Sequence, residues 1–264
     1  MMSVRARVVP LIGAIAAALF ACSDASAAAV TLPPAGDPFD YQIAGGYTPP
    51  DGVTVVSRDH DDDPAPGLYN ICYVNAFQAQ PGTEDEWGDL LLRDSSGEIV
   101  YDEGWGEAML DIRTAAKRQR IAAKVNVWID QCAENGFQAI EPDNYDSYDR
   151  APDNLLTSGQ AQAFIKLLSA HAHNLGLAIA QKNTVELAGN RVANGLDFAV
   201  AEECGYWEEC GDYVDAFGNN VIVIEYTEEG LEKACDGWRN ELSIVLRDVD
   251  VSTPGSGDYV YQTC

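Results

Sequence analysis

Eight short runs of apolar residues recur along this chain, each about the length of one β-strand. They are nearly continuous in apolar character rather than alternating, which is typical of strands buried on both faces of a parallel sheet. We expect strands at residues 41–43, 53–56, 69–74, 137–140, 177–180, 196–201, 221–224 and 242–246. This pattern restricts the chain to folds in which helices cover a mostly parallel sheet.

Helical spacing of apolar residues separates the later strands. It predicts helices at 111–135, 158–174, 185–194, 208–217 and 228–239. Thr157 is a suitable N-cap for the second of these helices, and Gly176 a suitable stop. Strand and helix alternate to the end of the chain, which favours a (β/α)8 barrel.

The first half of the chain departs from this regular alternation. The connections at 46–52 and 59–68 are rich in Pro, Gly and Asp and are too short for a crossover helix. The segment 78–110 is a long insertion with no predicted structure. We therefore predict an α/β fold, an irregular (β/α)8 TIM barrel with shortened early crossovers. A doubly wound open sheet is the alternative, but no GxGxxG or P-loop pattern supports it.

The first residues have the features of an export signal. Arg5 and Arg7 precede an apolar run at 8–21, and small residues at 25–27 offer a cleavage site. We expect a secretory signal at 1–27, with a lipoprotein signal to 21 and acylation of Cys22 as the alternative. A linker at 28–38 and one catalytic domain at 39–264 would follow. The protein should then be secreted or extracytoplasmic, with no transmembrane segment.

Six cysteines remain if Cys22 belongs to the leader, and an even number is typical of exported proteins with disulfides. Six cysteines allow fifteen connectivities. We favour a small loop closed by Cys204 and Cys210, a C-terminus tied by Cys235 and Cys264, and the remaining pair, Cys72 with Cys132.

The sequence gives no support for a metal or a cofactor. No CxxC or HExxH occurs, and His171 and His173 are two residues apart, so they would point in different directions on a helix. The acidic run 59–63 lacks the ligand spacing of an EF-hand loop and is better explained as a solvated turn.

The chain is strongly acidic, with 42 Asp and Glu against 16 Lys and Arg and a formal net charge of −26. Nucleic acid is excluded as a partner because binding it requires cations that neutralise phosphates. Such a charge would attract a cationic substrate, although it would also simply keep an exported monomer soluble.

Polar residues end nearly every predicted strand, and active sites of barrels lie at the carboxyl ends of the strands. These ends therefore predict a functional mouth. We expect Arg58, Arg247 and Lys182 to form ion pairs that hold the acids. The candidates for substrate binding are Asp59, Asn75, Glu141, Asn144, Lys182, Asn183, Glu203, Glu225, Tyr226 and Asp248.

Asp143 and Glu202 are the predicted catalytic pair, because they end the fourth and sixth strands and would face each other across the mouth. Glycosidic bond cleavage needs two such carboxylates. Side chains alternate along a strand, so Glu141 can share a face with Asp143 whereas Glu203 cannot share one with Glu202. Glu225 is the main rival for the acid role. Aromatic residues near strand ends could stack on sugars or pack in the core: Tyr47, Tyr73, Tyr145, Tyr148, Tyr206 and Trp207.

Eight short motifs follow one another along the chain: FDYQ at 39–42, VTVVSRD at 53–59, NICYVN at 70–75, DIR at 111–113, EPDN at 141–144, AQKN at 180–183, AEEC at 201–204 and VLRD at 245–248. Taken together, they resemble the endo-α-1,4-polygalactosaminidases, glycoside hydrolase family 114. The resemblance implies a barrel enzyme that cleaves internal α-1,4 bonds in galactosamine-containing polysaccharide without metal or cofactor.

The resemblance also implies a retaining mechanism. The catalytic aspartate of the family corresponds to Asp143 and its catalytic glutamate to Glu202, although the adjacent Glu203 could take that place instead. Two alternatives are a glycosidase acting on another α-linked polymer and a non-catalytic carbohydrate-binding protein of the cell envelope.

Overall fold

The computed structural model describes residue 2 and residues 30–264, and the structural statements below concern these residues. Apart from Met2, the predicted signal with its cleavage site and Cys22 lies outside them. Among the described residues, none of the helices combines the length and the apolar character needed to cross a bilayer.

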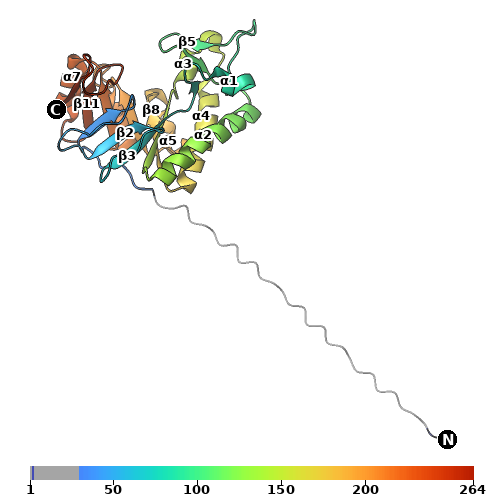
Figure 1. Cartoon of the computed structure of the whole chain (residues 1–264), viewed down its shortest axis with the longest axis horizontal. Coiled ribbons are helices and arrows are strands. Elements are labelled where there is room, and N and C mark those ends of the chain that lie inside the picture. Colours follow the sequence, from blue (N-terminus) through green and yellow to red (C-terminus); the bar gives the residue numbers. More distant parts are fainter. Residues whose placement is uncertain (1, 3–29) are drawn as a thin grey trace.

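Eight parallel strands form a nearly closed barrel in sequence order (Figure 1). They are β1 (Phe39–Gln42), β2 (Val55–Asp59), β3 (Tyr69–Asn75), β7 (Ala139–Asp143), β8 (Ala178–Lys182), β9 (Phe198–Glu202), β10 (Val221–Glu225) and β11 (Ser243–Arg247). A short β12 (Tyr261–Thr263) pairs antiparallel with β11. Arg247 Nη1 lies 3.2 Å from Asp40 Oδ1 where β11 approaches β1. The predicted irregular barrel is confirmed, and the sequential strand order is not that of a doubly wound sheet.

Alternation along the strands divides the buried residues into two cores. The inner core fills the barrel and includes Phe39, Tyr41, Phe198 and Ile224. The outer core lies between the barrel and its helices. A strand-end residue therefore faces the barrel mouth only if it lies an even number of positions from the inner-core residues of its strand.

The strands extend beyond the apolar runs that predicted them. β7 ends at Asp143 rather than Ile140, β8 at Lys182 rather than Ala180, and β9 at Glu202 rather than Ala201. Polar side chains continue the ladder here because they bind one another above the inner core. The residues that the sequence singled out as strand ends are thus held in the strands themselves.

The main helices are α2 (Ala115–Asn135), α4 (Ser158–Asn174), α6 (Cys210–Phe217) and α7 (Glu228–Trp238). Thr157 forms the expected cap of α4. α2 begins four residues later than predicted because Thr114 caps it. The predicted helix at 185–194 is instead a 3-10 helix, η3 (Val185–Asn190), followed by α5 (Arg191–Asn194). Within residues 30–264 no helix connects β1 to β2 or β2 to β3, as expected.

The insertion folds into a small sheet of order β4-β6-β5, formed by β4 (Gln78–Ala79), β5 (Tyr101–Asp102) and β6 (Glu107–Met109). It also carries α1 (Glu84–Trp87) and η1 (Gly88–Leu90). After β7, the chain forms α3 (Ser147–Arg150) and η2 (Pro152–Asn154). In Figure 1 the insertion and α3 lie together at the edge of the barrel.

Three disulfides join the pairs that the sequence favoured. Cys72–Cys132 links β3 to α2, Cys204–Cys210 closes the loop after β9, and Cys235–Cys264 fixes the C-terminus to α7. The first closes the longest loop, with a sequence separation of 60 residues. In the chain-entropy account it should therefore stabilise the fold most.

Candidate active site

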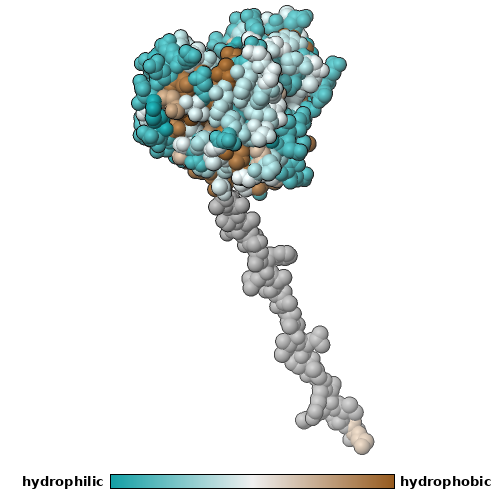
Figure 2. Space-filling view, turned by 60° about the vertical axis from the view of Figure 1, so that its left-hand side comes forward, coloured by the Kyte–Doolittle hydropathy of each residue, from teal (hydrophilic) through white to brown (hydrophobic). Residues whose placement is uncertain are grey.

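A cavity of about 260 Å³ opens at the carboxyl ends of the strands. Its lining includes Tyr41, Asp59, Tyr73, Trp105, Glu107, Asp143, Asn144, Asp146, Arg150, Asn183, Glu202, Tyr226 and Asp250. On the face shown in Figure 2, hydrophilic residues cover most of the surface and hydrophobic ones form small groups between them. Carboxylates, amides and hydroxyls make up most of the lining of the cavity, which is therefore a polar site.

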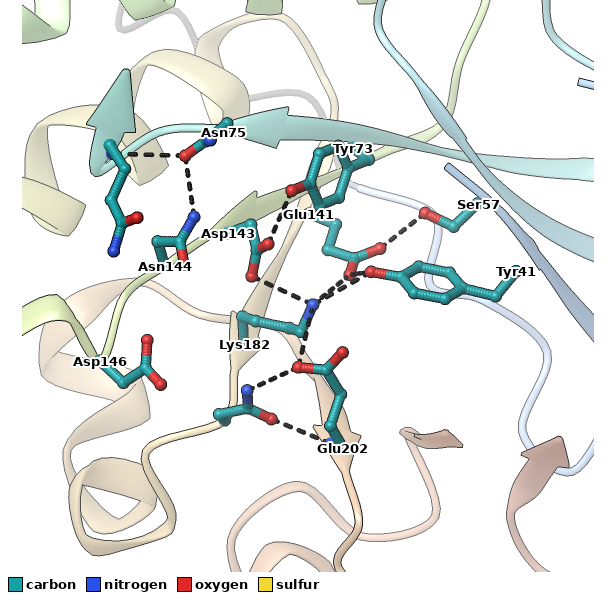
Figure 3. Close-up of polar contacts among 12 residues, drawn as sticks. Tyr41, Ser57, Tyr73, Asn75, Glu141, Asp143, Asn144, Asp146, Lys182 and Glu202 are labelled. Carbon is teal, nitrogen blue, oxygen red and sulfur yellow. Dashed lines mark hydrogen bonds and ion pairs between the residues drawn. The ribbon is translucent and has the colours of Figure 1, made fainter. Parts of the chain in front are cut away.

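Lys182 is the centre of the polar network below this cavity (Figure 3). Its ammonium nitrogen lies 3.1 Å from Glu141 Oε1, 3.1 Å from Asp143 Oδ1 and 3.4 Å from Glu202 Oε2. Burial alone would lower the pKa of Lys182, but the carboxylates outweigh it and hold this pKa well above its ordinary value. The ion-pair role expected of Lys182 is confirmed.

Asp143 is held from two sides. Lys182 binds one carboxylate oxygen, and the hydroxyl of Tyr73 donates a 2.7 Å hydrogen bond to the other, Oδ2. Burial would raise the pKa of Asp143, but Lys182 and Tyr73 bring this pKa below its ordinary value. The Asp143 side chain is 17% exposed, so an ionised oxygen remains accessible from the cavity.

Glu202 is fixed by amide and hydroxyl groups. Asn183 donates a 2.8 Å hydrogen bond to Oε2 and accepts one of 2.9 Å from the backbone N–H of Glu202. The hydroxyl of Tyr226 donates to Oε1. The side chain is 24% exposed, the most open of the three carboxylates around Lys182.

Glu141 lies beneath the cavity rather than in its lining. It is fully buried and accepts hydrogen bonds from Tyr41 at 2.9 Å and from Ser57 at 2.6 Å. Burial raises its pKa, against the effect of Lys182. Because no part of Glu141 is exposed, we infer that it holds Lys182 in place and does not contact the substrate directly.

Amides connect the insertion to β7. Asn144 donates a 2.9 Å hydrogen bond to Asn75 Oδ1, and Asn75 donates one of 2.9 Å to Glu107 Oε2. Arg150 donates a 2.6 Å hydrogen bond to Asn144 Oδ1. Asn144 has φ of 63°, which asparagine adopts more readily than most residues. Asn75 and Asn144 therefore position the side of the cavity that the insertion forms.

Three acids of the cavity, Glu107, Asp146 and Asp250, were not singled out in the sequence. Glu107 comes from the insertion, where no periodic pattern pointed to it. Asp146 follows the EPDN motif by two residues, so its position beside a strand end was a usable signal. Burial raises the pKa of Asp146 to about 6, although Arg150, 2.9 Å away, opposes the shift. Burial likewise raises the pKa of Glu107.

Besides Asn75, Glu141 and Lys182, three further candidates do not line the cavity. Glu203 follows Glu202 with φ of 59° and faces elsewhere, as alternation required. Glu225 alternates with the inner-core residues of β10, so it points to the outer core. It accepts a 2.7 Å hydrogen bond from the backbone N–H of Gly205, and burial raises its pKa to about 7. Asp248 accepts from the backbone N–H groups of Ser252 and Val260.

The other two cations expected to hold the acids lie outside the cavity lining. The Arg58 guanidinium donates to Gln42 and to the carbonyl oxygens of Tyr47 and Asp63. Within residues 30–264 it makes no ion pair, so that expectation was wrong for Arg58. Arg247 does pair with an acid, Asp40, but at the barrel seam.

Of the six aromatic residues considered for stacking on sugars or packing in the core, only Tyr73 lines the cavity, as a hydrogen-bond donor to Asp143. Tyr226, a candidate for substrate binding, lines it too. Tyr145 is fully buried, and Tyr47, Tyr148, Tyr206 and Trp207 lie outside the lining. Trp105, from the insertion, lines the cavity and is 54% exposed. It was missed because nothing local distinguishes it from an ordinary loop residue.

Two groups of possible metal ligands come close together in the described part of the chain. In one, Cys204 and Cys210 with Glu225, both sulfurs are used by the disulfide. The other is Asp59, His60 and Asp61, a partly exposed cluster at the end of β2.

A barrel with two partly exposed carboxylates at its mouth has the arrangement that glycoside hydrolases use. The sequence matches glycoside-hydrolase family GH114 over residues 21–264, and the chain belongs to this family. The structure of Aspergillus fumigatus Ega3 in complex with galactosamine is similar, with a TM-score of 0.71 and 22% identity; the match covers 89% of this chain and 98% of that one.

The glycoside hydrolase domain of PelA from Pseudomonas aeruginosa is also similar, with a TM-score of 0.56, 12% identity, and 86% and 98% of the two chains covered. At these identities the likeness to solved structures concerns the fold. No curated protein sequence matches the chain significantly.

Proposed function

We propose that this protein is an exported endo-acting hydrolase that cleaves α-1,4 bonds in galactosamine-containing polysaccharide with retention of configuration. Its family membership and the motifs that resemble polygalactosaminidases support the activity. The galactosamine in the Ega3 structure supports the choice of sugar. The three disulfides support an oxidising location outside the cytosol.

One observation carries the proposed mechanism: a single ammonium group touches both catalytic candidates. Lys182 Nζ lies 3.1 Å from Asp143 Oδ1 and 3.4 Å from Glu202 Oε2, so these oxygens can be no further apart than the sum of the two distances. This limit is about 6.5 Å, where the spacing of inverting enzymes begins, while retaining enzymes need about 5–5.5 Å. The distance between these two oxygens is therefore compatible with retention, which the family resemblance implies.

In the first step, Asp143 attacks the anomeric carbon, the bond to the leaving oxygen breaks, and Glu202 gives its proton to that oxygen. In the second step, Glu202 takes a proton from water, the water oxygen bonds to the anomeric carbon, and Asp143 leaves. The lowered pKa of Asp143 suits a nucleophile, which must be ionised. Tyr73 and Asn183 position the two carboxylates.

Charge supports an amine-bearing substrate. Besides the catalytic pair, Asp59, Glu107, Asp146 and Asp250 line the cavity. In the described part of the chain, Arg150 is the only lysine or arginine in that lining. A sugar with a free 2-ammonium group would find several carboxylates within reach, and the net charge of −26 would attract a cationic polymer.

The test is a reducing-end assay on α-1,4-linked galactosamine oligomers. Wild type should release reducing ends, whereas Asp143→Asn and Glu202→Gln should lose activity by at least about a thousandfold. Glu203→Gln is the matched control, because Glu203 adjoins Glu202 in sequence but lies outside the lining. Full activity in both catalytic variants would overturn the assignment. Proton NMR of the first product would distinguish retention from inversion.

A further inference from the structure

A second cavity, of about 240 Å³, adjoins the proposed active site. Asp59 and Gln80 line both cavities, so the two meet above the end of β2. We call the second cavity the side pocket; its other lining residues include His60, Gln78, Trp87 and Trp128. It is nearly as large as the active-site cavity, so a site that holds one sugar unit has a neighbour of similar capacity.

The wall of the side pocket is aromatic and firmly packed. The rings of Trp87 and Trp128 meet edge to face with centroids 6.0 Å apart, and His60 stacks on Trp128 at 5.0 Å. Trp87 is only 4% exposed. Since three elements, α1, α2 and the end of β2, supply these rings, the wall is already formed before any ligand arrives.

Gln78 adds an unsatisfied acceptor to the side pocket. Its amide nitrogen donates to Asp102 and to Ser147, both at 3.0 Å. Among residues 30–264 its Oε1 has no partner, although the residue is 1% exposed. An unpaired buried oxygen costs about 1–3 kcal/mol. A ligand hydroxyl or ammonium that donates to this oxygen would offset that cost.

The charges in the side pocket favour a cation. Asp59, Asp61 and Glu86 line it, and no lysine or arginine of residues 30–264 does. Lys124 does not line the side pocket, but its nitrogen lies 5.1 Å from the centroid of the Trp87 ring. Carboxylates and an unpaired acceptor beside an aromatic wall suit a sugar that carries an ammonium group.

We propose that the side pocket binds a second amino-sugar unit of the polymer, close to the unit whose bond is cleaved. The identity of the polymer rests on the proposed function, whereas the pocket itself rests on its lining. Asp59, at the boundary, would contact both units.

Binding can be tested without turnover. The chain has five tryptophans, and their indole N–H signals can be followed by NMR while Asp143→Asn protein is titrated with an α-1,4-galactosamine trimer. Trp128 should shift together with Trp105 of the active-site cavity, while Trp207 should not. A shift of Trp105 without Trp128 would overturn the side pocket and leave the proposed function intact. If Trp128 shifts but the wild type releases no reducing ends, the proposed function would be overturned and the side pocket would stand.

Kinetics give the second test. The double variant Asp61→Asn/Glu86→Gln should lose about tenfold in kcat/KM on long oligomers, as expected for about 1.4 kcal/mol of binding, and nothing on the shortest cleaved substrate. The matched control is Asp63→Asn/Asp85→Asn, exposed acids of the same two segments outside the lining. Equal losses on long and short substrates, or no loss on either, would contradict the proposal.

Discussion

Lys182 Nζ lies 3.1 Å from Asp143 Oδ1, and the lysine side chain is only 2% exposed. A cation in this position can be removed only by leaving buried carboxylates unpaired. We expect Lys182→Met to abolish hydrolysis and to lower the free energy of unfolding by about 3–5 kcal/mol, because breaking a buried ion pair leaves charges without compensation. Denaturant unfolding would measure this. Lys166→Met, at an exposed position of α4, should change little.

Tyr73→Phe removes the hydroxyl that donates to Asp143 Oδ2. Hydrogen bonds to charged groups contribute about 1.5–3 kcal/mol, so the pKa of Asp143 should rise toward its ordinary value. Because the nucleophile must be ionised, the acid limb of kcat/KM against pH should move to higher pH. Tyr47→Phe serves as the control, since its hydroxyl bonds Asp40 outside the cavity. An unmoved acid limb in Tyr73→Phe would argue against Asp143 as the nucleophile.

Trp105→Ala removes an exposed ring from the cavity lining. If the ring stacks on a bound sugar, KM for oligomers should rise by about tenfold at most, while the melting temperature stays close to that of wild type. Trp207 is also an exposed tryptophan but lies outside the lining, so Trp207→Ala should leave KM unchanged. The same KM in both variants would rule out stacking on Trp105.

Glu225→Gln should alter how stability depends on pH. Burial raises the pKa of Glu225 to about 7, whereas an unfolded chain releases this proton near pH ~4.3. Between these values the native state binds the extra proton, so stability falls as pH rises. The melting temperature of the variant should therefore decline less than that of wild type between pH 5 and pH 8. Glu228→Gln, at an exposed site, should follow wild type.

Hydrolysis of a deacetylated polymer should weaken as salt is added, because the net charge of −26 attracts a cation over a range that shrinks from about 10 Å at 0.1 M to about 3 Å at 1 M salt. A fully acetylated polymer should respond much less. Comparing initial rates across ionic strength measures the difference. The same response for both polymers would remove charge from the explanation of specificity.

The amino-acid sequence was enough to predict the barrel with its strands in chain order. It also favoured the disulfide pairs that the structure contains, without excluding the other connectivities. It could do so because runs of apolar residues, helical spacing and cysteine positions are local signals that survive in any parallel arrangement. It also located Asp143, Lys182 and Glu202 at strand ends. Alternation along a strand predicted that Glu202 and Glu203 point to opposite faces, but not which of the two faces the mouth.

Which of these groups contact one another could be known only from the folded barrel. That depends on how far the sheet closes and on the register between strands, and neither is encoded within one segment. Lys182 contacts three carboxylates because β7, β8 and β9 are neighbours in the barrel. Glu225 lies in the outer core, although it ends an apolar strand just as Asp143, Lys182 and Glu202 do. Trp105 and Glu107 reach the cavity because long-range packing folds the insertion beside the barrel mouth, which no local pattern indicated.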